Sequence, residues 1–267
     1  MAEKFAVPAV VSREEWLTAR KALLAKEKEL TKLQDRLSAE RRRLPMVRLD
    51  KDYVLQGKQG RVPLIDLFKG KRQLIIYHFM FNPNWEKGCP SCTKWADEAL
   101  SEGLIKNIEE HDTAFACVSR APIEKLEKYK ADNGWTFPWY SSADTTFNYD
   151  FGVTLDQSVK PMTYNYLTIA EHEKNGTGYY FEGEQPYELP GKSAFLQVNG
   201  EIFHTYSTFG RGCEATGGSP YFLDMTAFGR QESWEDSPPG WPQKPLPYDE
   251  RVKEEAAFVK GGKCCED

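Results

Sequence analysis

The chain has 267 residues and a formal net charge of -5 at pH 7, with basic and acidic residues mixed along it. No broad basic surface is expected, which argues against a nucleic-acid partner. No apolar run approaches the roughly 18 residues of a membrane span, and the apolar stretch near the start is interrupted by Pro8, so no membrane partner is expected. We expect a cytoplasmic protein built on one α/β domain with additions.

A long helix is predicted at the N-terminus, where Ser12 and Glu15 have the spacing of a capping box and the helical pattern continues to Pro45. Apolar residues recur every seven positions at Trp16, Leu23, Leu30, Leu37 and Leu44. Polar residues follow four positions after most of them, so a full coiled-coil seam is not encoded. We assign residues 1–45 to a helical extension whose stripe packs on its own domain or on a partner subunit in a homodimer. A self-standing coiled coil is the alternative.

The sequence after Pro45 predicts an α/β domain over residues 46–235. A hairpin around Gly57 and Gly60 precedes the apolar run 72–81, which predicts a central strand because a strand covered on both faces loses its polar alternation. The next elements are a helix from Cys92 to about His111, a strand over 113–120, a helix over 121–134 and a hairpin over 193–207 with Asn199 and Gly200 at its turn. This β-α-β-α-β-β order predicts a thioredoxin-like three-layer sandwich.

The segment "EKGCPSCTKW" places Cys89 and Cys92 between the central strand and the following helix. A thiol at a helix N-terminus faces unsatisfied backbone N–H groups and the positive end of the helix dipole, which favour the thiolate. Cys89 is therefore the candidate nucleophile and Cys92 the candidate resolving thiol. Pro90 fits the first turn, where its missing N–H costs nothing. The predicted active-site loop contains Trp85, Gly88, Pro90 and Ser91.

The cysteine pair has two other readings, a zinc site and a pair of inert thiols. A structural zinc site needs four ligands, and the chain has neither a second C-x-x-C nor a histidine pair at ligand spacing, so we expect no metal and no cofactor. Six cysteines in a chain of this length are too sparse for a disulfide-stapled secreted scaffold, and in a reducing cytosol any disulfide would be transient. Cys117 lies in an apolar run and is predicted to be a core thiol. Cys213 lies in a glycine-rich loop without a visible partner.

Four blocks of the sequence resemble the DUF899 family, which is described as thioredoxin-like predicted dithiol-disulfide oxidoreductases. The blocks are the C-P-S-C helix start after "LIIYHFMFNPNWEKG", then "FPWYSSADTTFNYDFGV", "SAFLQVNGEIFHTYSTFGRG" and "YFLDMTAFGRQE". They run in this order from about residue 10 to about residue 235. The resemblance implies a thioredoxin-like fold with Cys89 and Cys92 as the redox pair, and it brings no established substrate.

The sequence departs from better-known relatives at two places. Gly88 stands where thioredoxins carry a tryptophan, and Pro190 lies slightly before the position, near Lys192 and Ser193, where thioredoxins have a cis-proline. The segment before the central strand is similar to the start of peroxiredoxins. Their P-x-x-x-T/S-x-x-C motif is absent, however, because Asn82 and Glu86 occupy its first and fifth positions.

Auxiliary roles are assigned to residues outside the motif. His78 is either a proton shuttle for Cys92 or a core histidine. Three tryptophans form either an apolar rim for a partner's cysteine-containing segment or part of the core: Trp85, Trp95 and Trp139. Residues 236–267 are predicted to hold a Pro-rich segment, a short helix and a tail. In that tail, Cys264 and Cys265 follow two glycines and are either an incidental end or a thiol pair that exchanges with the Cys89–Cys92 disulfide.

The function predicted from these features is thiol-disulfide oxidoreduction. Cys89 attacks a disulfide-bearing substrate, Cys92 releases the reduced product, and an external thiol reductant resets the pair; the reverse direction, on a thiol-bearing substrate, fits equally well. A noncatalytic thioredoxin-fold binding protein for a protein partner or a soft metal is the alternative from another class. A peroxiredoxin-like thiol peroxidase is the third.

Overall fold

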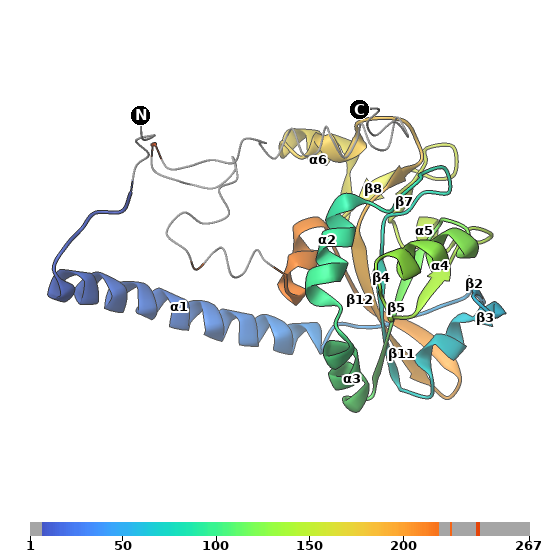
Figure 1. Cartoon of the computed structure of the whole chain (residues 1–267), viewed down its shortest axis with the longest axis horizontal. Coiled ribbons are helices and arrows are strands. Elements are labelled where there is room, and N and C mark those ends of the chain that lie inside the picture. Colours follow the sequence, from blue (N-terminus) through green and yellow to red (C-terminus); the bar gives the residue numbers. More distant parts are fainter. Residues whose placement is uncertain (1–6, 219–224, 226–238, 241–267) are drawn as a thin grey trace.

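An eight-stranded mixed β-sheet forms the body of the protein, as the computed structural model of the chain shows (Figure 1). The structure describes residues 7–218, 225 and 239–240. The strand order across the sheet is β1-β12-β11-β4-β5-β6-β2-β3. These strands are β1 (Val47–Arg48), β2 (Val54–Gly57), β3 (Gly60–Pro63), β4 (Gln73–His78), β5 (Thr113–Ser119), β6 (Trp139–Ser141), β11 (Gly191–Val198) and β12 (Glu201–Phe209).

Helices and two short strand pairs complete the described part of the chain. The α-helices are α1 (Arg13–Arg41), α2 (Pro90–Ala99), α3 (Glu102–Glu110), α4 (Ile123–Asp132), α5 (Phe147–Asp150) and α6 (Ile169–Lys174). The 3-10 helices are η1 (Leu64–Phe68), η2 (Gly178–Phe181) and η3 (Gly210–Thr216). The short pairs join β7 (Thr154–Leu155) to β10 (Tyr187–Glu188) and β8 (Thr163–Tyr164) to β9 (Leu167–Thr168).

The centre of the sheet has the topology of a thioredoxin-like fold. β4 runs parallel to β5, and β5 runs parallel to β6. α2 and α3 connect the first pair of strands and α4 connects the second. On its other side β4 pairs antiparallel with β11, which forms a hairpin with β12. The predicted thioredoxin-like α/β fold, with a long N-terminal helix and additional hairpins, is confirmed.

The sheet is the middle layer of the three-layer arrangement, and an apolar cluster lies on each of its faces. Successive side chains of β4 point to opposite faces, as in any strand. Tyr77 packs with Cys92 of α2 and Leu126 of α4 in one cluster. Leu74 and Ile76 pack with side chains of η1 and α5 in the other. The cysteine motif therefore belongs to the layer covered by α2 and α4.

The helix predicted from Cys92 to about His111 is broken into α2 and α3. Leu100 leaves the helical conformation with φ -96° and ψ 69°. The hydroxyl of Ser101 then accepts a hydrogen bond from the backbone N–H of Leu104 at 3.1 Å and caps α3. Serine competes with the helix for backbone N–H groups, which explains the break inside an otherwise helical pattern.

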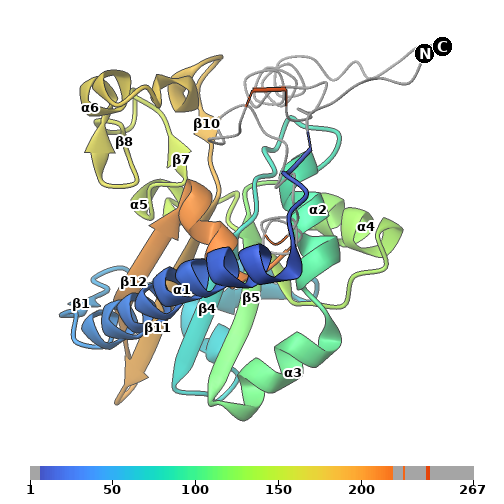
Figure 2. The same ribbon diagram turned by 90° about the vertical axis from the view of Figure 1, so that its left-hand side faces the viewer.

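The segment from β6 to β11 contains short strands and helices that no sequence pattern predicted. β6 has only three residues and extends the sheet beyond β5. After it, α5, α6 and the strands β7 to β10 form a lobe beyond one end of the sheet (Figure 2). Strands of two or three residues are too short to show a period of two, so no alternation marks them in the sequence.

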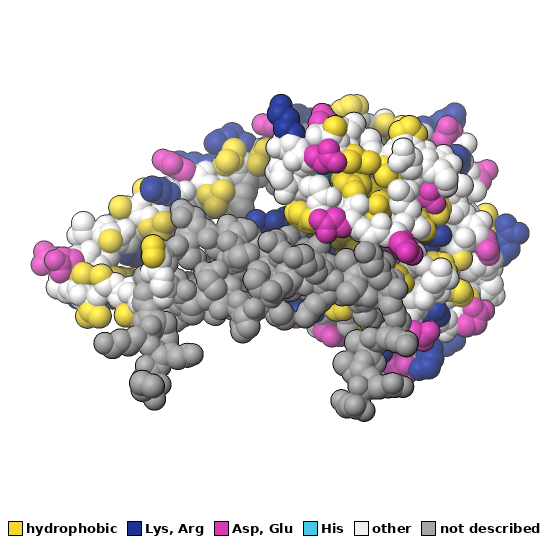
Figure 3. Space-filling model, turned by 90° about the horizontal axis from the view of Figure 1, so that it is seen from above, with side chains coloured by type: hydrophobic (Ala, Val, Ile, Leu, Met, Phe, Trp, Pro, Cys, Tyr) yellow, Lys and Arg dark blue, Asp and Glu magenta, His cyan; other side chains and the backbone are white. Residues whose placement is uncertain are grey.

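The long helix α1 begins and ends close to the predicted positions and extends away from the sheet (Figure 1). Ser12 and Glu15 form the predicted capping box. No described side chain of α1 is buried, so packing of the apolar stripe on the sheet is not seen. Figure 3 shows apolar side chains of α1 at the surface. None of the described helices has the length and apolar character that crossing a membrane requires.

Candidate active site

The C-P-S-C sequence occupies the start of α2, with Cys89 as the N-cap residue and Pro90 in the first turn. The backbone N–H of Cys89 donates to the Met80 carbonyl at 3.0 Å, which ties the loop to the end of β4. The Cys89 carbonyl accepts hydrogen bonds from the backbone N–H and the hydroxyl of Thr93, both at 2.9 Å. Cys89 is thus held where the free N–H groups and dipole of α2 favour a thiolate.

Gly88, in the position where thioredoxins carry tryptophan, is explained by two aromatic rings. A β-carbon built on Gly88 would lie 2.6 Å from a ring carbon of Phe79 and 3.1 Å from one of Tyr129. The Tyr129 hydroxyl in turn lies 2.9 Å from the hydroxyl of Thr93 in the first turn of α2. The backbone before Cys89 therefore passes directly over the aromatic layer, and only glycine fits without displacing a ring.

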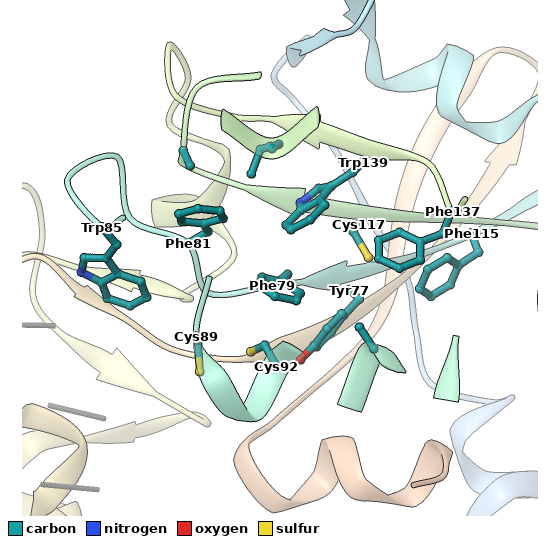
Figure 4. Packing of buried hydrophobic residues seen from close by; sticks show 13 residues of the cluster. Tyr77, Phe79, Phe81, Trp85, Cys89, Cys92, Phe115, Cys117, Phe137 and Trp139 are labelled. Atoms are coloured by element: carbon teal, nitrogen blue, oxygen red, sulfur yellow. The ribbon is translucent and has the colours of Figure 1, made fainter. Parts of the chain in front are cut away.

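Both thiols of the motif are buried, with Cys89 3% and Cys92 2% exposed. Cys89 Sγ lies 3.1 Å from the hydroxyl oxygen of Ser91, one of the predicted loop residues. The Tyr77 hydroxyl points toward Cys92 (Figure 4). Burial raises the pKa of Tyr77 well above its usual range, and the neighbouring Cys92 adds to this shift. The Tyr77 hydroxyl therefore keeps its proton and remains a hydrogen-bond donor.

Lys192 is the site residue whose role sequence reasoning missed. It lies on β11 directly opposite Tyr77 on β4, and its side chain is buried. The ammonium group lies 3.6 Å from the ring centroid of Trp95 on α2 and donates to the Cys213 carbonyl at 2.8 Å and to the Thr216 hydroxyl. Burial lowers the pKa of Lys192 to about 8, while the thiols of the cluster oppose that shift. A cation therefore lies beside the cysteine motif.

Pro190, which lies slightly before the position of the thioredoxin cis-proline in the sequence, does not follow a cis peptide bond. Among the described residues, the cis peptide bond is Gln185–Pro186, not the bond before Pro190. Lys192 and Ser193, near the position that matches the thioredoxin cis-proline, lie within β11. On this strand, the Lys192 ammonium group packs against Trp95 of α2, the helix that carries the dithiol.

Two cysteines outside the motif belong to the described residues, and both are buried thiols. Cys117 lies on β5, as predicted, and burial raises its pKa well above the usual range. Cys213, expected in a loop without a partner, lies in η3, where its Sγ is 3.6 Å from the Thr208 carbonyl. Burial raises the pKa of Cys213 to about 11. Its carbonyl is the acceptor for Lys192, so η3 is attached to the site.

The tryptophans near the motif do not form an exposed rim. Trp85 and Trp139 are buried in the same apolar cluster as the two thiols (Figure 4). The Trp85 carbonyl accepts a hydrogen bond from the Lys125 ammonium group at 2.8 Å, which fixes the loop before Gly88. Trp95 is half-buried, and its indole N–H donates to the Gly217 carbonyl at 3.1 Å. All three rings support the site from within.

His78 lies on the face of the sheet opposite the dithiol. Its ring packs near Phe147 of α5, and its Nε2 lies 2.8 Å from the Ser193 hydroxyl. That hydroxyl lies 2.8 Å from the Ser207 hydroxyl, which lies 2.7 Å from Nε2 of His204. Burial, with a smaller contribution from His204, lowers the pKa of His78 to about 3. This placement favours the core-histidine reading and gives no direct contact for a proton shuttle.

A buried ion pair holds the ends of two central strands, next to the loop that carries the dithiol. The guanidinium of Arg120, just after β5, lies 2.7 Å from the carboxylate of Glu188. Glu188 also accepts hydrogen bonds from Thr154 at 2.8 Å and from Asn82, just beyond β4, at 3.4 Å. Burial raises the pKa of Glu188 to about 7 although Arg120 acts in the opposite direction. No sequence motif indicated this pair.

Some predicted features lie outside the described residues. They are the domain end at residue 235, the Pro-rich segment and helix after it, and the Cys264–Cys265 tail. Within the described ranges, no three His, Cys, Asp or Glu side chains are grouped so that they would hold a metal ion.

A family model described as "Bacterial protein of unknown function (DUF899)" matches residues 5–248. The chain belongs to the DUF899 family. The match extends the resemblance seen in the sequence at both ends. It leaves the tail with Cys264 and Cys265 outside the family region. A search among curated proteins finds no match to this DUF899 chain.

Several solved structures are similar to this DUF899 protein at low identity. A mutant of peroxiredoxin Q from Xanthomonas campestris is 14% identical, with 61% of this chain and 85% of that chain covered and a TM-score of 0.41. Peroxidoxin BcpB from Mycobacterium tuberculosis is 15% identical, with 65% and 93% covered and a TM-score of 0.42. A putative protein disulfide isomerase from Bacteroides thetaiotaomicron is 19% identical, with 37% and 61% covered and a TM-score of 0.27. Likenesses at such scores carry no functional argument, so the function has to be argued from the site.

Proposed function

We propose that this DUF899 protein is a thiol-disulfide oxidoreductase in which Cys89 and Cys92 cycle between dithiol and disulfide. The observation that carries the proposal is the position of the two thiols in one turn at the start of α2. The helix N-terminus favours a thiolate at Cys89, and the Tyr77 hydroxyl is placed to donate to a thiolate at Cys92. A lone structural thiol would need neither arrangement.

The reaction is written as two exchanges. The Cys89 thiolate attacks one sulfur of the substrate disulfide, that S–S bond breaks, and the departing substrate thiolate takes up a proton. Cys92 then loses its proton, and its thiolate attacks Cys89 Sγ in the mixed disulfide. The second substrate thiol leaves, so the substrate gains two electrons and the enzyme holds a Cys89–Cys92 disulfide. An external thiol reductant then supplies two electrons to the Cys89–Cys92 disulfide and restores both thiols. Substrate oxidation follows the same steps in reverse.

We also propose a cellular compartment, partners and an oligomeric state for the protein. A dithiol that is reset by external thiols suits a reducing cytoplasm. The partners are then a disulfide- or thiol-bearing substrate and a thiol reductant, with neither nucleic acid nor a membrane among them. The exposed apolar stripe of α1 is the surface through which two copies would form a homodimer.

A redox titration of the purified protein tests the proposal. Alkylation and peptide mass spectrometry would report Cys89 and Cys92 separately, with Cys117→Ser as the control for a buried thiol outside the motif. We expect a reversible Cys89–Cys92 disulfide with a midpoint inside roughly -120 to -270 mV, the span of known thiol oxidoreductases. Cys92→Ser should accumulate the mixed disulfide on Cys89. Two thiols that stay reduced across this range would refute the proposal.

The burial of both thiols favours a second candidate, a noncatalytic binding protein that retains the fold. The two candidates differ in the effect of Cys89→Ser. This variant should abolish turnover and spare binding if the protein is an enzyme. A wild type that binds a partner without any turnover would support the second candidate. The peroxidase alternative gains no support, because Asn82, in place of the motif proline, is directed to Glu188.

A further inference from the structure

The cation beside the dithiol points to a further role in this site. We propose that Lys192, together with Tyr77, is a positioning residue that stabilises the Cys92 thiolate in the resolving step. The inference rests on the proposed dithiol chemistry and adds to it the groups that act on the second cysteine.

The geometry places Lys192 against the first turns of α2. Its position on β11 is opposite Tyr77, and its ammonium group lies 5.2 Å from the centroid of the Tyr77 ring. The same group lies 3.6 Å from the centroid of Trp95, three residues after Cys92 and hence on the same side of the helix. The ammonium is therefore held between the helix that carries Cys92 and the strand that carries Tyr77.

The polar contacts of Lys192 leave its charge without a carboxylate partner. Within the described part of the chain, its ammonium donates to the Cys213 carbonyl and the Thr216 hydroxyl, both neutral groups of η3. The groups whose charge would favour the ammonium are thiols: Cys213, Cys92 and Cys117. A buried ammonium is costly unless an anion compensates it. The anion that the proposed chemistry creates in this cluster is the Cys92 thiolate.

The two groups act on Cys92 in complementary ways. The resolving step begins when Cys92 loses its proton, which places a negative charge in a buried site. Lys192 would stabilise this charge through space, and the Tyr77 hydroxyl would donate a charge-assisted hydrogen bond to the sulfur. In this account Lys192 remains protonated and transfers no proton, so Cys92 releases its proton to solvent.

A pH profile reports this role because the ammonium titrates. The pKa of Lys192 is lowered to about 8, chiefly by burial, so its positive charge is present at neutral pH and is lost above that value. The titratable groups that face it are Tyr77 from β4, Cys92 from α2, Cys117 from β5 and Cys213 from η3. The Cys117 and Cys213 thiols stay protonated at neutral pH because burial raises their pKa values.

The test isolates the resolving step. The full-length protein carries Cys264→Ser and Cys265→Ser, so that the tail releases no thionitrobenzoate. Attack of Cys89 on 5,5′-dithiobis(2-nitrobenzoate) releases one thionitrobenzoate and leaves the other on Cys89 as a mixed disulfide. Attack of Cys92 on Cys89 then releases the second thionitrobenzoate, and the absorbance of this second phase is followed from pH 6 to 9.

Lys192→Met keeps an unbranched apolar chain and removes the charge. Lys94→Met is the matched control, because Lys94 also belongs to the Cys92 helix but is exposed and paired with Glu98.

We expect Lys192→Met to release thionitrobenzoate about tenfold more slowly at pH 7 and to need a higher pH for half-maximal release. Lys94→Met should match the wild type. Tyr77→Phe keeps the ring, removes only the hydroxyl, and should also slow release, which covers the case in which Lys192→Met does not fold. If the folded Lys192→Met and Tyr77→Phe variants release thionitrobenzoate at the wild-type rate and with the wild-type pH profile, the inference is overturned and the proposed function stands. Absence of release from the wild type would overturn the proposed function together with it.

Discussion

The ring of Phe79 lies so close to Gly88 that a β-carbon at position 88 would be 2.6 Å from one of its carbons. Gly88→Ala should therefore destabilise the fold by about 1–3 kcal/mol through overpacking. Gly103→Ala is the control, because a β-carbon there meets no atom closer than 4.0 Å and alanine favours the helix by about 0.5–1 kcal/mol. Urea denaturation measures both changes. Equal effects of the two variants would contradict the close packing at Gly88.

Burial of His78 predicts a pH dependence of stability. Its pKa is about 3 in the folded chain against an ordinary 6.5, so the unfolded chain binds the proton first as the pH falls. Stability from this residue is present above pH 6.5 and declines below it, by about 3 kcal/mol at pH 4.5. His78→Gln should lack that part of the decline in denaturation curves at pH 4.5 and 7. If the free energy of unfolding fell by the same amount between pH 7 and pH 4.5 in the variant and the wild type, this prediction would be wrong.

The Arg120–Glu188 pair predicts the opposite trend. Because the pKa of Glu188 is raised to about 7 from 4.5, its contribution to stability is fully present below pH 4.5 and is lost as the pH rises through 7. Arg120→Ala leaves a buried carboxylate without its cation and should cost about 3 kcal/mol at pH 8. The cost should shrink at pH 5, where Glu188 is protonated. A cost independent of pH would show that Arg120 acts through packing alone.

The apolar stripe of α1 predicts an effect on association without an effect on folding. Leu23 and Leu30 are 52% and 54% exposed, whereas Leu126 in α4 is fully buried. The double variant Leu23→Glu/Leu30→Glu should change the free energy of unfolding by less than about 0.5 kcal/mol, and Leu126→Ala should cost about 2–5 kcal/mol. In sedimentation velocity the double variant should be monomeric and the wild type dimeric. A monomeric wild type would exclude the proposed homodimer.

The features that the sequence predicted well are those with local signals. The capping box at Ser12 and Glu15 is formed within one turn of helix. Asn199 and Gly200 turn the β11–β12 hairpin with φ values of 53° and 83°, which these two residue types adopt readily. Cys89 could be placed at a helix start because an apolar strand, a loop and a helical pattern follow one another directly in the chain.

The cation of the site could not be predicted, because no local pattern places it there. Lys192 meets Tyr77 only through the antiparallel register of β11 on β4, and it meets Trp95 only through packing between sheet and helix. A weak signal existed, since a charged residue at the start of an apolar strand is unusual. The sequence suggested a role for His78 instead, but the alternation of β4 turns it to the other face.

The burial of both sulfurs limits when the dithiol can react at all. Thiol-disulfide exchange requires the attacking sulfur to reach the target bond, and Cys89 is 3% exposed with its neighbours in place. In the proposed oxidoreductase, exchange would proceed from a locally opened form, at an observed rate equal to the intrinsic thiolate rate multiplied by the opening equilibrium constant. An opening free energy of about 3 kcal/mol would slow exchange with any small disulfide more than a hundredfold. A partner whose contacts favour the opened loop would escape this penalty, so the protein would choose its substrates by access to the sulfur as well as by reduction potential.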